Sequence, residues 1–262
     1  MIFGNFFKTC SGSKVREIQV YILNQMQFSL KIKTLYRFWE FRLRAEKESI
    51  KYLLAQDLKG TTAIDVGANK GVYTYWMSKA VGKNGKVISF EPQPELGAFL
   101  KEIKSSFSLN NIEIVNKGLS SKASQMNLYR RKIGDGGATI ESENNKLFDP
   151  TGKEKISVEV TALDSFLKDK NVSRLSFIKC DVEGHELEVF KGGSETLKKY
   201  KPTLLFECHH EEVLQGDVFR FLENMGYKGF FFSGEQRVDA HDFDTIPYPK
   251  SDNHRNYIFI NN

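Results

Sequence analysis

The sequence predicts an α/β fold in which helices cover both faces of a mainly parallel sheet. Three observations lead to this prediction. From Gly60 onward, short strand-like runs alternate with segments of helical periodicity. A turn that contains two glycines follows the first of these runs, where open α/β sheets commonly hold a ligand. The length of 262 residues suits one large domain with a modest extension.

The first half of this domain has the most regular alternation. Residues 61–66 form an apolar, β-branched run that predicts a strand, and residues 72–81 have the period of a helix. Residues 86–91 predict a second strand, because the turn residues 82–85 separate it from that helix. Residues 95–106 predict a second helix by their period.

The second half of the domain completes the sheet. After a third strand at 112–115, an insertion over about residues 119–160 interrupts the alternation. Regularity then returns, with strands expected at 175–181, 203–209, 228–233 and 256–260 and helices at 162–168, 186–191 and 216–226. The pattern therefore predicts a seven-stranded, mostly parallel sheet.

The insertion contains two β-like runs, around residues 126–130 and 156–160, with a polar loop between them. These runs predict a hairpin. The loop carries Gly134, Gly136 and Gly137 and few apolar anchors, so we expect it to be mobile without substrate and to become ordered over it.

The basic character of the chain belongs to its N-terminal segment. The net charge is +5, and the first 60 residues contain 11 Lys and Arg against 5 Asp and Glu, whereas the remainder contains 27 against 28. The expected division is a helical, basic extension over residues 1–59 and an α/β domain over residues 60–262.

Aromatic side chains are interleaved with the basic residues of this extension, at Tyr36, Phe38, Trp39 and Phe41. The favoured hypothesis is a helical lid that packs these aromatics onto the domain. The alternative is a peripheral contact with anionic lipid heads or with an acidic partner. Nucleic acid is not expected as a partner of the protein.

Cysteine usage and hydropathy predict a cytoplasmic protein. Cys10, Cys180 and Cys208 form neither a disulfide framework nor a paired metal-binding motif. No apolar run approaches the roughly 20 residues that cross a bilayer. The N-terminus also lacks the ordered regions of a secretory signal peptide.

The strongest local signal lies between the first strand and the first helix. Gly67 and Gly71 allow the backbone to approach a ligand closely, which a β-carbon would prevent. Their spacing differs from the Gly-x-Gly-x-x-Gly of dinucleotide sites. Asp65 at the strand end suits a cationic ligand better than a pyrophosphate, and S-adenosylmethionine carries both an ammonium and a sulfonium group. A tight turn without a ligand is the alternative.

Glu91 ends the second predicted strand. In βαβ nucleotide sites, a carboxylate at this position accepts hydrogen bonds from both ribose hydroxyls. Pro92 stops the strand and stiffens the loop that follows. An ordinary carboxylate at a helix start is the alternative, and the coincidence of Glu91 with the glycine turn favours the ligand.

Polar motifs also end the fourth and fifth predicted strands, where ligands bind in open α/β sheets. The catalytic candidates in these motifs are His209, Asp181, Glu207 and Glu183. His209 is favoured as a general base near neutral pH, slightly ahead of Asp181. Alternatively, Asp181, Glu207 and His209 together hold a divalent cation. A capped helix start and a solvated loop are the structural alternatives.

Four motifs occur in order along the domain, at Asp65–Gly71, Phe90–Pro92, Asp181–Glu186 and Asn256–Phe259. Together they resemble the motifs of the FkbM family of methyltransferases. The resemblance covers about residues 46–260 and implies a class I, Rossmann-like methyltransferase fold with S-adenosylmethionine as cofactor. It further implies O-methylation of a hydroxyl of a sugar, a glycolipid or polysaccharide, or a related small-molecule acceptor.

The resemblance also implies roles for individual residues. The glycine turn would surround the methionine end of the cofactor, Glu91 would hold the ribose, and Asn116 would lie near the adenine. The full set assigned to the cofactor is Asp65, Gly67, Ala68, Asn69, Gly71, Tyr73, Glu91, Pro92, Asn116 and Asp181. The acceptor, the dependence on a metal and the oligomeric state stay open.

Two other functions compete with methyl transfer. A nicotinamide-dependent oxidoreductase would explain the Tyr-x-x-x-Lys spacing of Tyr75 and Lys79, although these residues come too early in the chain for such a dyad. One face of a helix explains them better. A non-catalytic binding protein of the same fold is the second alternative, and carboxylates at three strand ends argue against it.

Overall fold

The computed structural model describes three stretches of the chain, residues 28–140, 149–246 and 254–261. The chain divides into two compact units, residues 1–45 and residues 46–262. None of the helices in the described stretches combines the length and the apolar composition needed to cross a bilayer.

In the smaller unit, residues 28–40 are α-helical and η2 (Phe41–Ala45) continues them as a π-helix. The division between the units falls before α2 (Lys47–Ala55), and not at residue 59 as the sequence predicted. The reason is the apolar face of α2, because Ile50 and Leu53 are fully buried and α2 packs beside α3 within the larger unit.

The larger unit is built on an eight-stranded sheet with the order β10-β9-β11-β8-β7-β1-β2-β3. Its strands are β1 (Thr62–Val66), β2 (Lys86–Phe90), β3 (Ile112–Val115), β7 (Leu175–Cys180), β8 (Thr203–His209), β9 (Tyr227–Ser233), β10 (Gln236–Asp239) and β11 (His254–Asn261). The five strands from β3 to β8 are parallel, whereas β11 is antiparallel to both of its neighbours.

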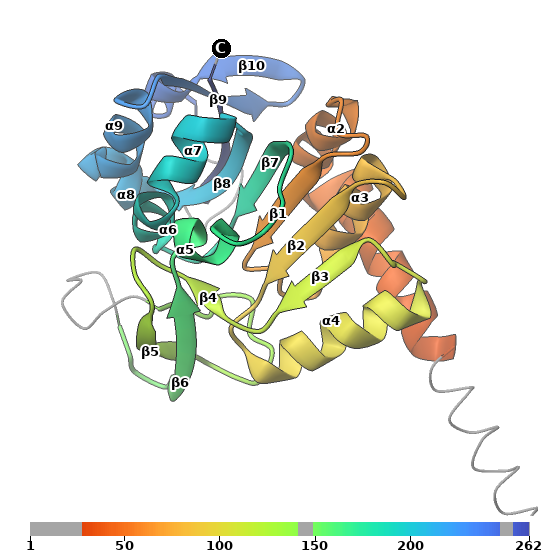
Figure 1. The fold of residues 1–262 in the computed structure, drawn as a ribbon. Helices are drawn as coiled ribbons and strands as arrows, with labels where there is room; N and C mark the ends of the chain where they lie inside the picture. The colour runs from red at the N-terminus through yellow and green to blue at the C-terminus, as the bar shows by residue number, and fades with distance from the viewer. Residues whose placement is uncertain (1–27, 141–148, 247–253, 262) are drawn as a thin grey trace, which may run out of the picture. The chain divides into compact units, whose positions relative to one another are not determined.

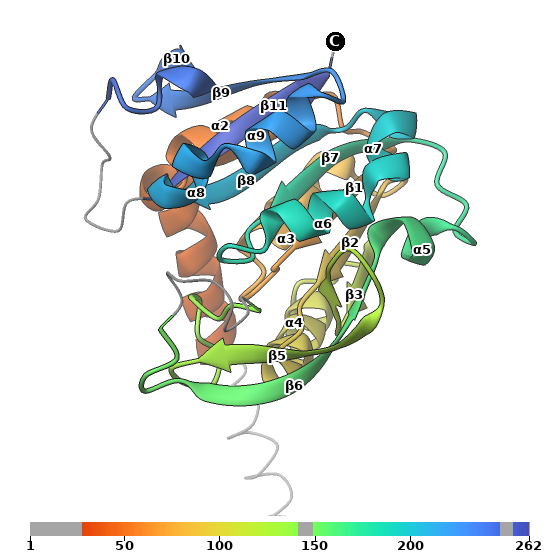
Figure 2. The ribbon, with the colours of Figure 1, turned by 90° about the vertical axis from the view of Figure 1, so that its left-hand side faces the viewer.

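Helices cover both faces of this sheet, as predicted (Figure 1). On one face lie α2, α3 (Val72–Val81) and α4 (Pro94–Ser106). On the other lie α5 (Leu163–Leu167), α6 (Glu186–Gly192), α7 (Ser194–Tyr200), α8 (His210–Gln215) and α9 (Asp217–Glu223), which Figure 2 shows in front of the strands. Because both faces are covered, every residue of β1 is buried.

The sheet has one strand more than the seven predicted. The additional strand is β10, which pairs with β9 through the tight turn at Gly234 and Glu235 and extends the edge of the sheet. Three of the four residues of β10 are exposed, and the strand ends at a short 3-10 helix, η3 (Ala240–Asp242). β10 was not predicted, because an exposed edge strand carries no alternating apolar pattern.

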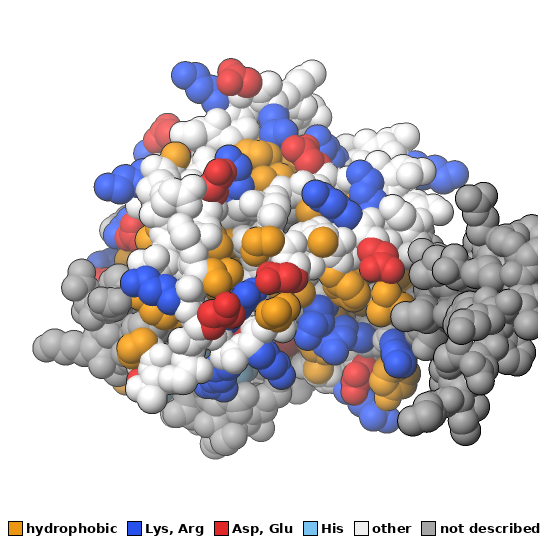
Figure 3. Space-filling model, turned by 90° about the horizontal axis from the view of Figure 1, so that it is seen from below, with side chains coloured by type: hydrophobic (Ala, Val, Ile, Leu, Met, Phe, Trp, Pro, Cys, Tyr) orange, Lys and Arg blue, Asp and Glu red, His pale blue; other side chains and the backbone are white. Residues whose placement is uncertain are grey.

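The insertion forms a second sheet of three strands, with the order β4-β6-β5. The strands β5 (Ser124–Arg130) and β6 (Glu154–Thr161) are antiparallel, and β4 (Gly118–Leu119) pairs parallel to β6. This small sheet lies beyond the carboxyl edge of the large one in both ribbon views. On the side seen in Figure 3, acidic, basic and apolar side chains are interspersed.

Candidate active site at the carboxyl edge of the sheet

The turn between β1 and α3 requires its glycines. Gly67 has a φ of +76°, and a β-carbon there would lie 1.9 Å from the carbonyl oxygen of Asp181. The amides of Gly67 and Ala68 both donate to the carbonyl oxygen of Phe90, at 3.0 and 2.9 Å. The turn is therefore fastened to β2 on one side and pressed against the end of β7 on the other.

Glu91 follows β2 as a buried carboxylate, 3% exposed. Its two oxygens accept hydrogen bonds from the backbone amides of Asn69, at 2.8 Å, and Gln93, at 2.9 Å. Burial, with a smaller contribution from Asp65, raises the pKa of Glu91 to about 7. The two amides orient the carboxylate, and each oxygen retains a lone pair for a further donor.

Asp65 lies beneath this turn and does not face a cleft. It is 2% exposed and accepts a hydrogen bond from the Thr74 hydroxyl at 2.5 Å. Thr74 also contacts the hydroxyl of Ser89 at 2.8 Å. Burial raises the pKa of Asp65 to about 6. The expectation that Asp65 faces an open crevice is therefore corrected, because its side chain joins β1 to α3, and its predicted contact with the cofactor stays a prediction.

A pocket of about 470 Å³ opens beside Glu91. Its lining comes from the ends of β1, β2 and β7 and from the small sheet: Val66, Gly67, Asn69, Phe90, Glu91, Pro92, Gln93, Gly118, Leu119, Leu128, Asp135, Gly136, Ala138, Ile140, Asp181 and Val182. The small sheet and its loop supply half of the apolar side chains, Leu119, Leu128, Ala138 and Ile140. The pocket thus combines polar and apolar side chains, as is usual for a small-molecule site.

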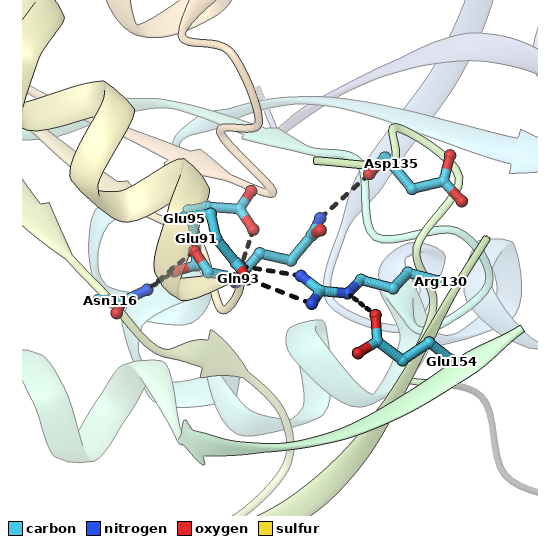
Figure 4. A network of polar contacts seen from close by, with 7 residues as sticks. All are labelled: Glu91, Gln93, Glu95, Asn116, Arg130, Asp135 and Glu154. Atoms are coloured by element: carbon cyan, nitrogen blue, oxygen red, sulfur yellow. Dashed lines mark hydrogen bonds and ion pairs between the residues drawn. The ribbon is translucent and has the colours of Figure 1, made fainter. Parts of the chain in front are cut away.

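The loop between β5 and β6 is fastened over this pocket (Figure 4). Arg130, 3% exposed, donates to Glu95 at 2.8 and 3.2 Å and to Glu154 at 2.9 Å. The Gln93 side chain donates to the carbonyl oxygen of Asp135 at 3.0 Å, and Figure 4 shows it reaching toward the loop. The predicted mobility of this loop stays a prediction.

The carbonyl oxygen of the same Gln93 side chain is left without a donor. This Oε1 atom is buried and has no hydrogen-bond partner among the described residues, although Gln93 lines the pocket. A buried carbonyl oxygen without a donor is unfavourable by about 1–3 kcal/mol. It therefore marks a position where a ligand with an N–H or O–H group gains a hydrogen bond.

Asp181 lies at the end of β7 beside the glycine turn, and its neighbour Lys179 is a fully buried ammonium group. The Lys179 Nζ atom is 3.4 Å from Asp181 Oδ2 and 5.2 Å from the centre of the Tyr73 ring. Burial opposes the charge of Lys179, but Asp181 and Glu207 raise its pKa above the usual value. For Asp181, burial outweighs Lys179 and raises the pKa to about 7.

The loop after Asp181 has an unusual backbone. Glu183 and Gly184 have φ angles of 56° and 98°. The buried Glu186 carboxylate accepts hydrogen bonds from the amides of Val182, at 2.9 Å, and Gly184, at 3.1 Å. Burial raises the pKa of Glu186. Glu186 therefore holds the loop that places Glu183 next to the pocket, and the Thr139 hydroxyl adds a hydrogen bond to the Glu183 carbonyl at 2.7 Å.

The histidines at this edge pair with carboxylates. His209 Nε2 lies 3.3 Å from Glu183 Oε2, and this contact raises the pKa of His209 to about 9. His254 Nε2 lies 2.7 Å from Glu207 Oε1. Burial raises the pKa of Glu207, but His254 and Lys179 more than offset this effect and hold it at about 2. The raised pKa disfavours the predicted role of His209 as a base near neutral pH.

The alternative of a metal held by Asp181, Glu207 and His209 also finds no support in the geometry. Within the described stretches, the side chains that gather like metal ligands are instead Glu186, Cys208 and Glu212. Glu212 is already engaged with the backbone, because its carboxylate accepts a hydrogen bond from the amide of His209 at 3.0 Å. Burial raises the pKa of the Cys208 thiol and so disfavours the thiolate that would bind a metal. Near Asp181, the Lys179 ammonium already supplies a positive charge.

Five of the ten residues assigned to the cofactor line the pocket: Gly67, Asn69, Glu91, Pro92 and Asp181. The other five support it from outside: Asp65, Ala68, Gly71, Tyr73 and Asn116. Asn116 donates to the carbonyl oxygen of Glu91 at 2.7 Å and steadies the loop after β2. The Tyr73 hydroxyl donates to Glu46 at 3.0 Å.

Sequence reasoning missed Gln93 and Lys179. Gln93 was detectable from its place directly after Glu91 and Pro92. Lys179 gave no signal, because a lysine in a strand is normally expected to be exposed. The Tyr75 and Lys79 pair proved to be one helix face, with Lys79 Nζ 5.1 Å from the centre of the Tyr75 ring, and neither residue lines the pocket.

Comparison with known proteins agrees with this geometry. The family described as the methyltransferase FkbM domain matches residues 65–228. This chain belongs to the FkbM methyltransferase family. The match begins at the turn below Glu91 and extends through β7 and β8, so it includes both ends of the site.

Two curated relatives of this FkbM methyltransferase are methyltransferases. Methyltransferase sdnD of Sordaria araneosa is 27% identical over 188 residues, which cover 63% of this chain and 72% of the relative. The hexuronic acid methyltransferase AglP of Haloferax volcanii is 26% identical over 168 residues, 64% of each chain.

Solved structures share the fold. The methyltransferase FkbM of Methylobacillus flagellatus superimposes with a TM-score of 0.52 at 16% identity, over 87% of this chain and 54% of that one. A Streptococcus mutans protein crystallised with S-adenosylhomocysteine gives a TM-score of 0.50 at 10% identity, over 83% and 97% of the two chains. This chain thus spans about half of the first structure. The class I, Rossmann-like methyltransferase fold predicted from the sequence is confirmed.

Proposed function

We propose that this FkbM methyltransferase transfers a methyl group from S-adenosylmethionine to a hydroxyl group of a sugar, a glycolipid or polysaccharide, or a related metabolite. The observation that carries the proposal is the pocket in which the oriented carboxylate of Glu91 lies beside the unsatisfied carbonyl of Gln93. A carboxylate beside a buried acceptor suits a ligand that presents several N–H and O–H donors.

The pocket fits the groups of this cofactor one by one. Glu91 would accept from the ribose hydroxyls, and Gln93 Oε1 would accept from the exocyclic amine of the adenine. Leu119, Leu128 and Ile140 offer an apolar surface for the adenine ring. At the other side of the pocket, the turn that contains Gly67 and Asn69 would meet the methionine part.

When bound, S-adenosylmethionine supplies an electrophilic methyl group. A hydroxyl attacks it well only while its proton is being removed, and a base with a pKa near the working pH removes a proton best. Asp181, with its pKa near 7, meets this requirement, whereas Glu207 is too acidic. Lys179 holds the Asp181 carboxylate in place.

The choice of a hydroxyl acceptor follows from the charges at this edge. The relative AglP is named for a hexuronic acid, which offers both hydroxyl and carboxylate oxygens. Asp181, Glu183 and Glu207 each lie beside Lys179, His209 or His254, so the charges at this edge are already balanced. An uncharged hydroxyl suits such an edge better than a carboxylate, which would add an uncompensated charge.

Calorimetry with S-adenosylhomocysteine tests the cofactor. We expect it to bind at least ten-fold more tightly than S-inosylhomocysteine, which lacks the exocyclic amine, and NAD⁺ not to bind. In Gln93→Leu the preference for the adenosyl compound should shrink, because the acceptor for the amine is gone. Binding of NAD⁺ in place of S-adenosylhomocysteine would refute the proposal.

The acceptor is tested with S-adenosylmethionine labelled in its methyl group and a panel of sugars. A methyl ether formed on a hydroxyl resists mild alkali, whereas a methyl ester is hydrolysed. We expect an alkali-stable product. An alkali-labile product would mean that the acceptor atom is a carboxylate oxygen.

A further inference from the structure

The helix of the smaller unit carries a concentrated stripe of exposed apolar side chains. Eight large hydrophobic side chains are exposed in the described stretches, and six of them belong to this helix. They form the apolar stripe: Phe28 (62% exposed), Ile32 (53%), Leu35 (36%), Tyr36 (64%), Trp39 (43%) and Leu43 (60%). Single exposed apolar residues are ordinary, but a contiguous set indicates an interaction surface.

The spacing places these six residues on one side of the helix. They follow one another at intervals of three, four or one residues, and a turn of 100° per residue keeps them within an arc of roughly 100°. The helical backbone runs through residues 28–40 and into η2, so the stripe is continuous. The predicted packing of the extension's aromatic side chains onto the domain stays a prediction.

The charges beside the stripe have nearly one sign. Residues 28–45 contain five basic residues and a single acidic one, Glu40. The basic residues are Lys31, Lys33, Arg37, Arg42 and Arg44. On a helical projection Lys31 and Arg42 border one edge of the stripe, Lys33 and Arg44 lie beyond the other edge, and Arg37 lies on the far side of the helix. The Arg42 guanidinium lies 4.9 Å from the centre of the Trp39 ring, so Arg42 lies against the stripe.

We infer that this helix binds the surface of an anionic lipid bilayer, with the apolar stripe in the interfacial region and the basic residues at the lipid phosphates. Large apolar, Trp and Tyr side chains favour the interfacial region of a bilayer, and long basic side chains beside them reach its head groups. A second copy of the chain would place two equally basic surfaces face to face, which charge repulsion opposes.

Vesicle flotation with the full chain tests the inference. We expect strong binding to vesicles of phosphatidylcholine with 30% phosphatidylglycerol, roughly ten-fold weaker binding to phosphatidylcholine alone, and release in high salt. Ile32→Ser with Leu43→Ser should weaken binding by at least about ten-fold. The matched control changes the two exposed apolar residues outside the stripe, Ile133→Ser with Leu214→Ser, and should bind like the unchanged protein.

Charge reversal separates lipid binding from other interactions. Lys33→Glu with Arg44→Glu should reduce binding to the anionic vesicles about ten-fold or more, whereas Lys83→Glu with Lys101→Glu should not. Thermal unfolding should be the same in all variants, because these side chains are exposed. Absence of binding to anionic vesicles, equal losses in the controls, or a dimer that the stripe variants dissociate would overturn the inference.

Discussion

The carboxyl edge of the sheet has two ends, and they balance their charges differently. At the end of β2, Glu91 is oriented by backbone amides and forms no ion pair with another residue of the described stretches. At the ends of β7 and β8, Asp181, Glu183 and Glu207 each lie beside Lys179, His209 or His254. The first end retains capacity for a ligand's donors, whereas the second is already neutralised and suits an uncharged acceptor.

The largest expected effect concerns the base at the second end. Asp181→Asn should lower turnover at saturating cofactor by roughly 10²–10⁴-fold, whereas His209→Gln should lower it by less than about ten-fold. Turnover should rise with pH through about 7, because the base acts when deprotonated and the pKa of Asp181 is about 7. A rise that occurs only near pH 9 would transfer the role to His209, whose pKa is about 9.

The junction between the two ends is tested by Gly67→Ala. The new β-carbon would meet the carbonyl oxygen of Asp181, so we expect a loss of about 3 kcal/mol or more in the free energy of unfolding, measured with urea. Gly216→Ala is the matched control, since Gly216 has a φ of +73° in the left-handed helical region and its new β-carbon would meet no atom closer than 3.7 Å, and it should lose about 1 kcal/mol. Equal losses would show that the contact with β7 is unimportant.

The contrast in cofactor binding is tested with one carboxylate from each end. In Glu91→Gln, the neutral side chain has one acceptor oxygen in place of two, so either Asn69 or Gln93 loses its hydrogen bond to this side chain. The charged acceptor for the cofactor is lost as well, so the affinity for S-adenosylhomocysteine should fall ten-fold or more. Glu183→Gln should change this affinity by no more than about two-fold. Calorimetry measures both, and a larger loss in Glu183→Gln would reverse the assignment of the two ends.

The smallest effect is the stabilisation from His209. Its pKa in the folded protein, about 9, exceeds the ordinary value of 6.5, so its contribution is fully present below pH 6.5 and disappears as the pH rises through 9. The pair with Glu183 is partly exposed, so the contribution should stay below about 1 kcal/mol. Urea unfolding of the unchanged protein and of His209→Gln should differ at pH 6 and coincide at pH 10.

The sequence alone determined most of the framework of this protein. β3, β8 and α3 occupy the residues predicted for them, because each is a periodic apolar segment bounded by turn residues. Periodicity failed where polar residues formed regular structure, as in α8 and β10. The turn at Gly67 and the place of Glu91 were also predictable, since both follow from local backbone requirements at the end of a strand.

Only the tertiary structure decided what the charged groups do. The sequence made Asp65 and Glu91 equivalent strand-end carboxylates, but Asp65 is turned to Thr74 beneath the turn and Glu91 to the pocket. His209 was a plausible base until Glu183 came within 3.3 Å and raised its pKa. Lys179 is buried because β7 lies inside the sheet between β1 and β8. Protonation depends on burial and on partners distant in the chain, and folding alone brings these together.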